Sequence, residues 1–168
     1  MIFRAGFTTS RSWISRTIRW ATRGHVSHAY VVFDDIPGVG HVAFEAAWCG
    51  WRETSRTKVA GVQTEIPVDV NVDAAFALCR EWLNIPYDYA GLFGEIPVMI
   101  GRILGKQKWP NPFASPHHMF CSEASTLIIQ RTARVKTGLE GVDARTVDPS
   151  YELAALVAMM RRSDAGRV

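Results

Sequence analysis

The spacing of apolar residues predicts a group of strands in the first half of the chain. Residues 27–33 and 41–46 are β-rich runs on either side of a turn-forming segment at 34–38, which predicts a hairpin. Residues 59–68 are predicted as a further strand, because apolar and polar positions alternate there. The segment 48–56 contains two tryptophans and a glycine, and it is predicted as an edge strand or a packed loop.

The chain before this group predicts one short strand and one helix. Residues 1–7 are expected to form a strand or lead-in, and residues 11–22 a helix with its N-cap in Thr8-Thr9-Ser10. One face of this helix is apolar and is expected to dock on the core, while the arginines lie largely away from it. The apolar face consists of Trp13, Ile14, Thr17, Ile18 and Ala21.

Another helix is predicted after residue 70. It begins at Asn71 or Asp73 and is ended by Asn84-Ile85-Pro86, since proline cannot continue a helix. Cys79 lies on its apolar face and is therefore predicted as a core residue. The complete face is Val72, Ala75, Phe76, Cys79 and Leu83.

Two further helices are predicted near the C-terminus, over residues 122–131 and 151–160. The second follows Asp148-Pro149-Ser150, which places a proline near the first helical position. The remainder of this half is predicted without regular structure: an apolar segment interrupted by glycine and proline at 90–104, loops at 105–116 and 136–147, and a frayed polar tail from residue 161.

This order of elements predicts an α+β protein with a small antiparallel sheet, rather than alternating β-α-β units. The 168 residues are enough for one domain with its own core, and no repeat, linker or low-complexity tract divides them. We therefore expect a single domain over residues 1–168.

Composition sets limits on the compartment and the partners. The chain is 48% hydrophobic and 21% charged, as globular proteins are, and its net charge of +3 is too small to indicate nucleic acid by itself. Three cysteines cannot all pair within one chain, and none forms a CxxC motif. Both points favour a reducing compartment, cytoplasmic or viral, over a disulfide framework.

The positive charge is concentrated at the N-terminus, where five arginines precede the first acidic residue, Asp34. Such a start also resembles an organelle transit peptide, but it lacks a secretory apolar run with a cleavage site and continues directly into an apolar strand. The 11–22 helix is predicted as a surface helix, with contact to a membrane surface or nucleic acid as the alternative. No stretch of about 18 uninterrupted apolar residues predicts a membrane span.

The strongest candidate for chemistry is Cys121, predicted at the start of the 122–131 helix. A thiol in a first helical turn faces unpaired backbone N–H groups and the positive end of the helix dipole, and both favour the thiolate. The backbone N–H of Cys121 is also the natural first donor of an oxyanion hole. The pattern alone equally allows a small buried apolar residue at this position.

Nucleophilic cysteine catalysis also needs an imidazole and a group that orients it. His28 begins one strand of the predicted hairpin, and Glu45 lies near the end of the other, so strand pairing should bring them together. Carboxylates seldom enter core strands without a partner. His25 is the competing base, and a salt bridge to an N-terminal arginine is the alternative role for Glu45.

The order of three short motifs resembles the permuted branch of the NlpC/P60 papain-like superfamily, which includes YiiX-like and viral cysteine hydrolases. In that branch the histidine strand precedes the cysteine helix. The resemblance covers most of residues 8–157 and implies a papain-like α+β fold with Cys121 as nucleophile, His28 as base and Glu45 as orienting residue. The motifs are Ser27-His28, Phe44-Glu45-Ala46 and Phe120-Cys121-Ser122-Glu123, with Pro86-Tyr87-Asp88 and Asp148-Pro149-Ser150 also similar.

The resemblance implies a hydrolase that works through a thioester acyl-enzyme without a cofactor. An amide bond, in a peptide or cell-wall fragment, is the leading substrate class. An acyl lipid, hydrolysed or transferred to an acceptor, is the second. The rival interpretation is a non-catalytic binding or structural module of the same fold that acts through its basic N-terminal helix.

Three further residues are candidates for substrate contact: Tyr30, Tyr87 and His118. The tyrosines are also candidates for a second oxyanion donor, although Tyr87 could instead cap a following helix. His117 and His118 are expected to line the approach to Cys121. These histidines supply ligands for Zn²⁺ in principle, but their spacing to Cys121 is not a common zinc pattern, so no metal site is expected.

Overall fold

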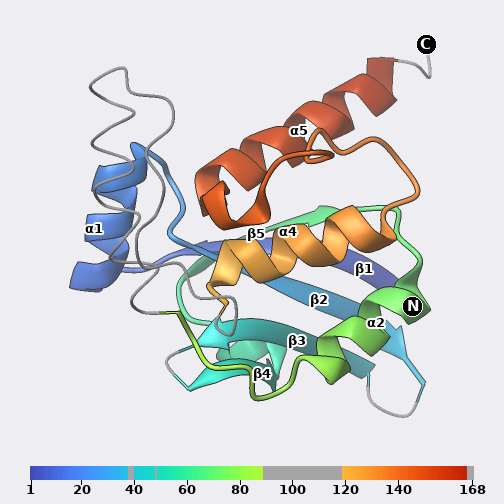
Figure 1. The fold of residues 1–168 in the computed structure, drawn as a ribbon, viewed down its shortest axis with the longest axis horizontal. Helices are drawn as coiled ribbons and strands as arrows, with labels where there is room; N and C mark the ends of the chain where they lie inside the picture. Colours follow the sequence, from blue (N-terminus) through green and yellow to red (C-terminus); the bar gives the residue numbers. More distant parts are fainter. Residues whose placement is uncertain (38–39, 48, 89–118, 166–168) are drawn as a thin grey trace.

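A five-stranded antiparallel sheet carries the fold (Figure 1). The computed structural model describes residues 1–37, 40–47, 49–88 and 119–165. The strand order is β4-β3-β2-β1-β5, which confirms the predicted α+β class with an antiparallel sheet. The strands are β1 (Ile2–Thr9), β2 (His28–Ile36), β3 (Gly40–Ala47), β4 (Gly50–Thr54) and β5 (Val62–Pro67).

The N-terminal strand is an interior strand of the sheet, because β1 pairs with β2 on one side and with β5 on the other. The β2–β3 hairpin and an edge strand at β4 are both confirmed. β2 extends through residues 34–36, which were predicted as turn. The strand predicted over 59–68 is shorter, since β5 begins only at Val62. The 3₁₀ turn η1 (Arg56–Lys58) comes before it, and residues 59–61 form an irregular link between the two.

Helices α2 and α4 pack against one face of the sheet, and α5 packs against α4 (Figure 1). The cap of α1 is Ser12, which accepts a hydrogen bond from the Ser15 N–H, and not Thr8-Thr9-Ser10. The predicted frayed tail is wrong as far as residue 165, since α5 remains helical to that point. The helices are α1 (Trp13–Thr22), α2 (Val72–Glu81), α4 (Cys121–Thr132) and α5 (Pro149–Ala165), with a 3₁₀ turn η2 (Ala144–Thr146).

The main core lies between the sheet and its helices, and it takes residues from all five strands and from α2, α4 and α5. The Phe33 ring makes edge contacts with Phe3, Phe44 and Phe76, at centroid separations of 5.4, 5.8 and 5.2 Å. Cys79 is fully buried, as predicted. The interrupted apolar segment predicted at 90–104 and the loop predicted at 105–116 lie outside the described residues.

The docking of α1 differs from the sequence prediction. Trp13, predicted to face the core, is 68% exposed, whereas Ser15 is buried. The Ser15 hydroxyl lies 2.7 Å from the Ser27 hydroxyl at the start of β2. The side chains of Ile14 and Ala21 lie outside the described part of the structure. Ile18 of the predicted apolar face is half-buried, so the docked side of the helix contains part of that face together with the buried hydroxyl of Ser15.

Gly6 is required by the position of the Tyr30 ring. The two residues pair across β1 and β2, and a Cβ atom on Gly6 would lie 2.2 Å from the nearest ring carbon. Tyr30 is fully buried and its hydroxyl donates to Glu65, so the ring has little room to move. We expect Gly6→Ala to lower the unfolding free energy by about 2–3 kcal/mol in urea titrations. In a Tyr30→Ala background the same change should be nearly neutral, and an equal loss in both backgrounds would contradict the explanation.

Candidate active site

Cys121 and His28 each begin an element, and both elements begin at the same end of the molecule (Figure 1). Two backbone hydrogen bonds hold the chain that enters α4: Met119 N–H donates to the Pro86 carbonyl, and Asp88 N–H donates to the Met119 carbonyl. Phe120 is then extended, and Cys121 is the first helical residue. The thiol is 4% exposed and is hydrogen-bonded to the His28 side chain.

The electrostatics of this pair favour charge separation. Burial raises the pKa of the Cys121 thiol, but the hydrogen bond and charge of His28, with backbone groups of Ala29 and Ser122, outweigh burial and lower that pKa overall. Burial likewise lowers the pKa of His28, but Cys121 and Glu45 raise it to about 10. Both directions favour a thiolate beside an imidazolium, the form of cysteine that reacts as a nucleophile.

Glu45 orients the imidazole from the neighbouring strand. The His28 Nε2 atom lies 3.0 Å from Glu45 Oε2, which leaves the other ring nitrogen for Cys121. The residue directly opposite Glu45 is Tyr30, so His28 lies two positions along β2 on the same face. The register is therefore shifted slightly from the predicted one, but the alternation of side chains still brings the two groups together.

A second partner also holds Glu45. Arg52, directly opposite it on β4, donates through Nε at 3.1 Å and Nη2 at 2.6 Å to Glu45 Oε1. Although burial raises the pKa of the Glu45 carboxyl, these bonds and charges lower it overall. The salt bridge considered in the sequence therefore exists, but with Arg52 and not with an N-terminal arginine. The four side chains therefore contact one another in sequence: the Cys121 thiol, the His28 imidazole, the Glu45 carboxylate and the Arg52 guanidinium.

We expect Glu45→Gln to weaken the ion pair without removing its members. Loss of the carboxylate charge should lower the pKa of His28 and raise the pKa of Cys121. The reactivity of Cys121 toward iodoacetamide near pH ~6 should fall several-fold, and the unfolding free energy by about 1–3 kcal/mol. The matched control is Glu53→Gln. Glu53 lies next to Arg52 on the same strand, but it accepts a hydrogen bond from Arg80. Equal reactivity in both variants would contradict the assignment.

The structure separates the remaining candidates. Tyr30 is fully buried and its hydroxyl donates to Glu65 at 3.1 Å, so it is not available to contact substrate or an oxyanion. Tyr87 is half-buried and forms a parallel bridge with Met119, which places it beside the start of α4. His25 is exposed, and Cys121 contacts His28 instead. His117 and His118 lie outside the described residues.

Two side chains that lie near the site, Arg52 and Glu152, were not identified from the sequence. Arg52 could have been found as an opposite charge paired across β3 and β4. Glu152 in α5 is fully buried, and its Oε1 accepts a 2.6 Å hydrogen bond from Ser125 in α4. Burial raises the pKa of Glu152 to about 8, and the charge of Cys121 adds to this effect. The sequence feature that could have identified Glu152 is its position on the otherwise apolar face of the last helix.

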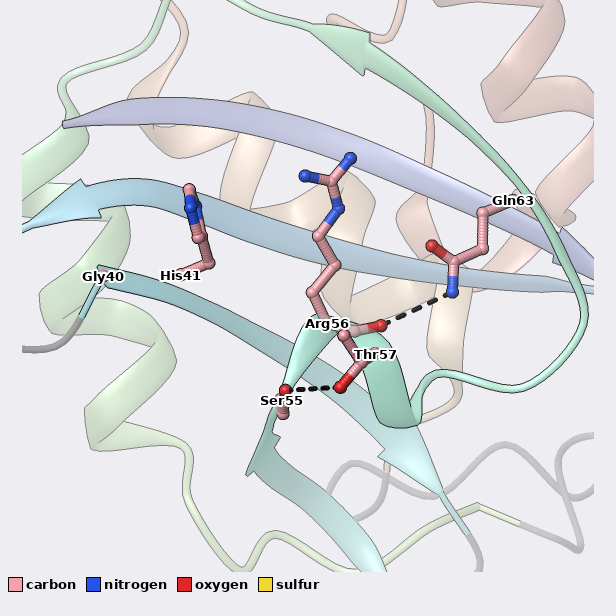
Figure 2. Close-up of a pocket in the computed structure, with 6 residues that line it drawn as sticks. All are labelled: Gly40, His41, Ser55, Arg56, Thr57 and Gln63. Atoms are coloured by element: carbon pink, nitrogen blue, oxygen red, sulfur yellow. Dashed lines mark hydrogen bonds between the residues drawn. The ribbon is translucent and has the colours of Figure 1, made fainter.

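A separate pocket lies at the other end of the β2–β3 hairpin (Figure 2). Its volume is about 520 Å³, and none of its lining residues belongs to the Cys121 group. Two of them are held by buried acids: His41 by Asp34 at 2.7 Å, and Arg56 by Glu65. The lining residues are Gly40, His41, Ser55, Arg56, Thr57 and Gln63.

The described residues contain no group of three or more His, Cys, Asp or Glu side chains that could hold a metal ion. Within the same part of the chain, no helix is long and apolar enough to cross a bilayer. Comparison of the chain with family models, with curated proteins and with solved structures gave no match.

Proposed function

We propose that the protein is a cysteine hydrolase that cleaves an amide bond in a peptide or cell-wall-type substrate. The observation that carries the proposal is the connected group of Cys121, His28 and Glu45. Its three residue types are those needed for nucleophilic catalysis, in the required order. Structural ion pairs also shift pKa values, but they seldom include a thiol in the first turn of a helix.

The reaction begins with the thiolate of Cys121 and protonated His28. The thiolate attacks the substrate carbonyl, and the resulting oxyanion is stabilised by the backbone N–H of Cys121, a first-turn amide with no acceptor within the helix. The His28 imidazolium protonates the leaving amine as the amide bond breaks, which gives a thioester. Neutral His28 then takes a proton from water, and the water oxygen displaces the thiolate.

We also propose a papain-like fold of the permuted NlpC/P60 type. In its support, the histidine strand and the glutamate strand are neighbours, and the helix that carries the cysteine comes later in the chain and packs against the sheet. The sheet also presents His28 and Glu45 on one face, and His28 begins β2 at the end of the molecule where α4 begins.

An acyl lipid is the second candidate substrate. The observation that favours it is the exposed pair Trp13 and Trp20 on α1, a helix that is hydrogen-bonded through Ser15 to Ser27, the residue before His28. A lipid-facing helix next to the catalytic base would suit a substrate delivered from a bilayer.

Trapping of the acyl-enzyme tests the proposed function. The protein is incubated with matched amide and ester libraries, quenched in acid and digested, and the Cys121 peptide is examined by mass spectrometry. We expect the Cys121 peptide to carry an added mass derived from the substrate. This mass should be absent in Cys121→Ala. It should remain in Cys49→Ala, which removes an exposed thiol on another segment. Turnover retained in Cys121→Ala or His28→Ala would overturn the proposal.

A further inference from the structure

Two tryptophans of the first helix lie on its side that faces away from the protein. Ser15 is buried against Ser27, and Arg19 Nε donates back to the Ser15 carbonyl on the same side. Trp13 and Trp20 are seven residues apart, so they lie on one face of α1, roughly opposite Ser15. They are 68% and 71% exposed.

Two large indole side chains exposed on one helix are unusual on a protein surface. A helix of a globular protein normally buries its apolar face, and contiguous exposed apolar groups mark interaction sites. In Figure 1, α1 lies at one end of the sheet, and its C-terminal end adjoins the start of α5, because a Cβ atom on Gly24 would lie close to both Thr22 and Ser150. No element in the described part of the chain buries either tryptophan, since most of the surface of each side chain is exposed.

The charge carried by this N-terminal segment has a single sign. Arg16 is exposed on the side of α1 that adjoins the tryptophans, Arg23 is exposed at the C-cap of the helix, and no Asp or Glu occurs before Asp34. Arginine beside tryptophan suits the boundary of an anionic bilayer, because the indole ring occupies the headgroup region and the guanidinium pairs with phosphate or carboxylate groups.

We propose that α1 is a docking site for an anionic lipid surface, with Trp13 and Trp20 inserted at the headgroup level and Arg16 and Arg23 paired with anionic headgroups. The helix lies in the plane of the bilayer and does not cross it. The hydroxyl pair of Ser15 and Ser27 fixes the orientation of the helix relative to the sheet. The proposal does not depend on the chemistry of Cys121.

Flotation of the full chain with vesicles tests this directly. The vesicles contain about three parts phosphatidylcholine to one part phosphatidylserine, and a second set contains phosphatidylcholine alone. We expect binding to the first set only. Arg16→Gln plus Arg23→Gln should weaken it roughly 25-fold, since each arginine near an anionic surface contributes about fivefold. Trp13→Ser plus Trp20→Ser should weaken it about tenfold or more.

Matched controls come from α5, where Arg161 and Arg162 are exposed and Tyr151 is 48% exposed. Arg161→Gln plus Arg162→Gln, and separately Tyr151→Ser, should leave binding unchanged. Circular dichroism of each variant confirms folding, which is expected because every substituted side chain is on the surface. Equal binding to both vesicle sets, or equal losses in the α5 variants, would overturn the proposal.

Oxidative footprinting gives an independent readout. Trypsin separates Trp13 and Trp20 into different peptides, because arginines flank each of them. Both tryptophans should be oxidised in the free protein and protected by the anionic vesicles. Protection of both already without vesicles would show that another part of the chain or a second copy covers the face, and protection by nucleic acid but not by vesicles would identify a different partner. Either result would overturn the proposal.

Discussion

Replacement of His28 by alanine is expected to raise the pKa of Cys121, because burial then acts on the thiol without the opposing imidazolium. The measurement is the rate of alkylation by iodoacetamide against pH, mapped by peptide. At pH ~6 the rate at Cys121 should fall roughly tenfold, even though a more basic thiolate is intrinsically the better nucleophile. The midpoint of the pH profile is therefore the decisive quantity.

The chain provides its own controls for this measurement. Cys49 is exposed and serves as the accessible comparison thiol, while Cys79 is fully buried, and burial raises its pKa well above the usual value. His25→Ala removes an exposed imidazole three residues before His28 and should leave the Cys121 profile unchanged. A Cys121 midpoint equal to that of Cys49, or one unaffected by His28→Ala, would favour the non-catalytic module.

Glu152→Gln is expected to stabilise the protein increasingly as the pH rises. Burial raises the pKa of Glu152 to about 8 in the folded state, against about 4.3 in an unfolded chain. Between these values the folded protein keeps a proton that the unfolded chain has released, so the wild type loses about 1.4 kcal/mol of unfolding free energy per pH unit. Glutamine does not ionise and avoids this loss.

The expected difference is on the order of 3 kcal/mol between pH ~5 and ~8, and it should level off above pH ~8, where both states are ionised. Urea unfolding at a series of pH values measures it. Glu81→Gln, at an exposed position on α2, should give a small difference that does not vary with pH. A constant offset for Glu152→Gln across this range would show that the buried carboxyl is already ionised near neutral pH.

Local patterns were sufficient for most elements of the fold. Turn residues flanked by β-rich runs predicted the β2–β3 hairpin, and of the two predicted helix starts, Asn71 and Asp73, the first is the one that caps α2. These features depend on neighbours within a few residues, which one sequence displays completely. The pairing of His28 with Glu45 was also accessible, because alternation along two paired strands fixes which side chains share a face.

Contacts between distant segments were less accessible. The sequence predicted that α1 docks through its apolar face, whereas Trp13 of that face is exposed and Ser15 is buried against Ser27. Helical periodicity describes the two faces equally, whereas docking depends on the groups that the rest of the fold presents.

The sequence by itself determined the α+β class, the hairpin, and Cys121, His28 and Glu45 as residues able to act together. Only the tertiary structure decided that β1 is an interior strand, that the Tyr30 hydroxyl is hydrogen-bonded to Glu65, that Arg52 holds Glu45 and that Glu152 is buried beside α4. The reason is physical: spacing along the chain encodes local geometry, while burial and pKa values depend on the desolvation and charge of partners brought from elsewhere.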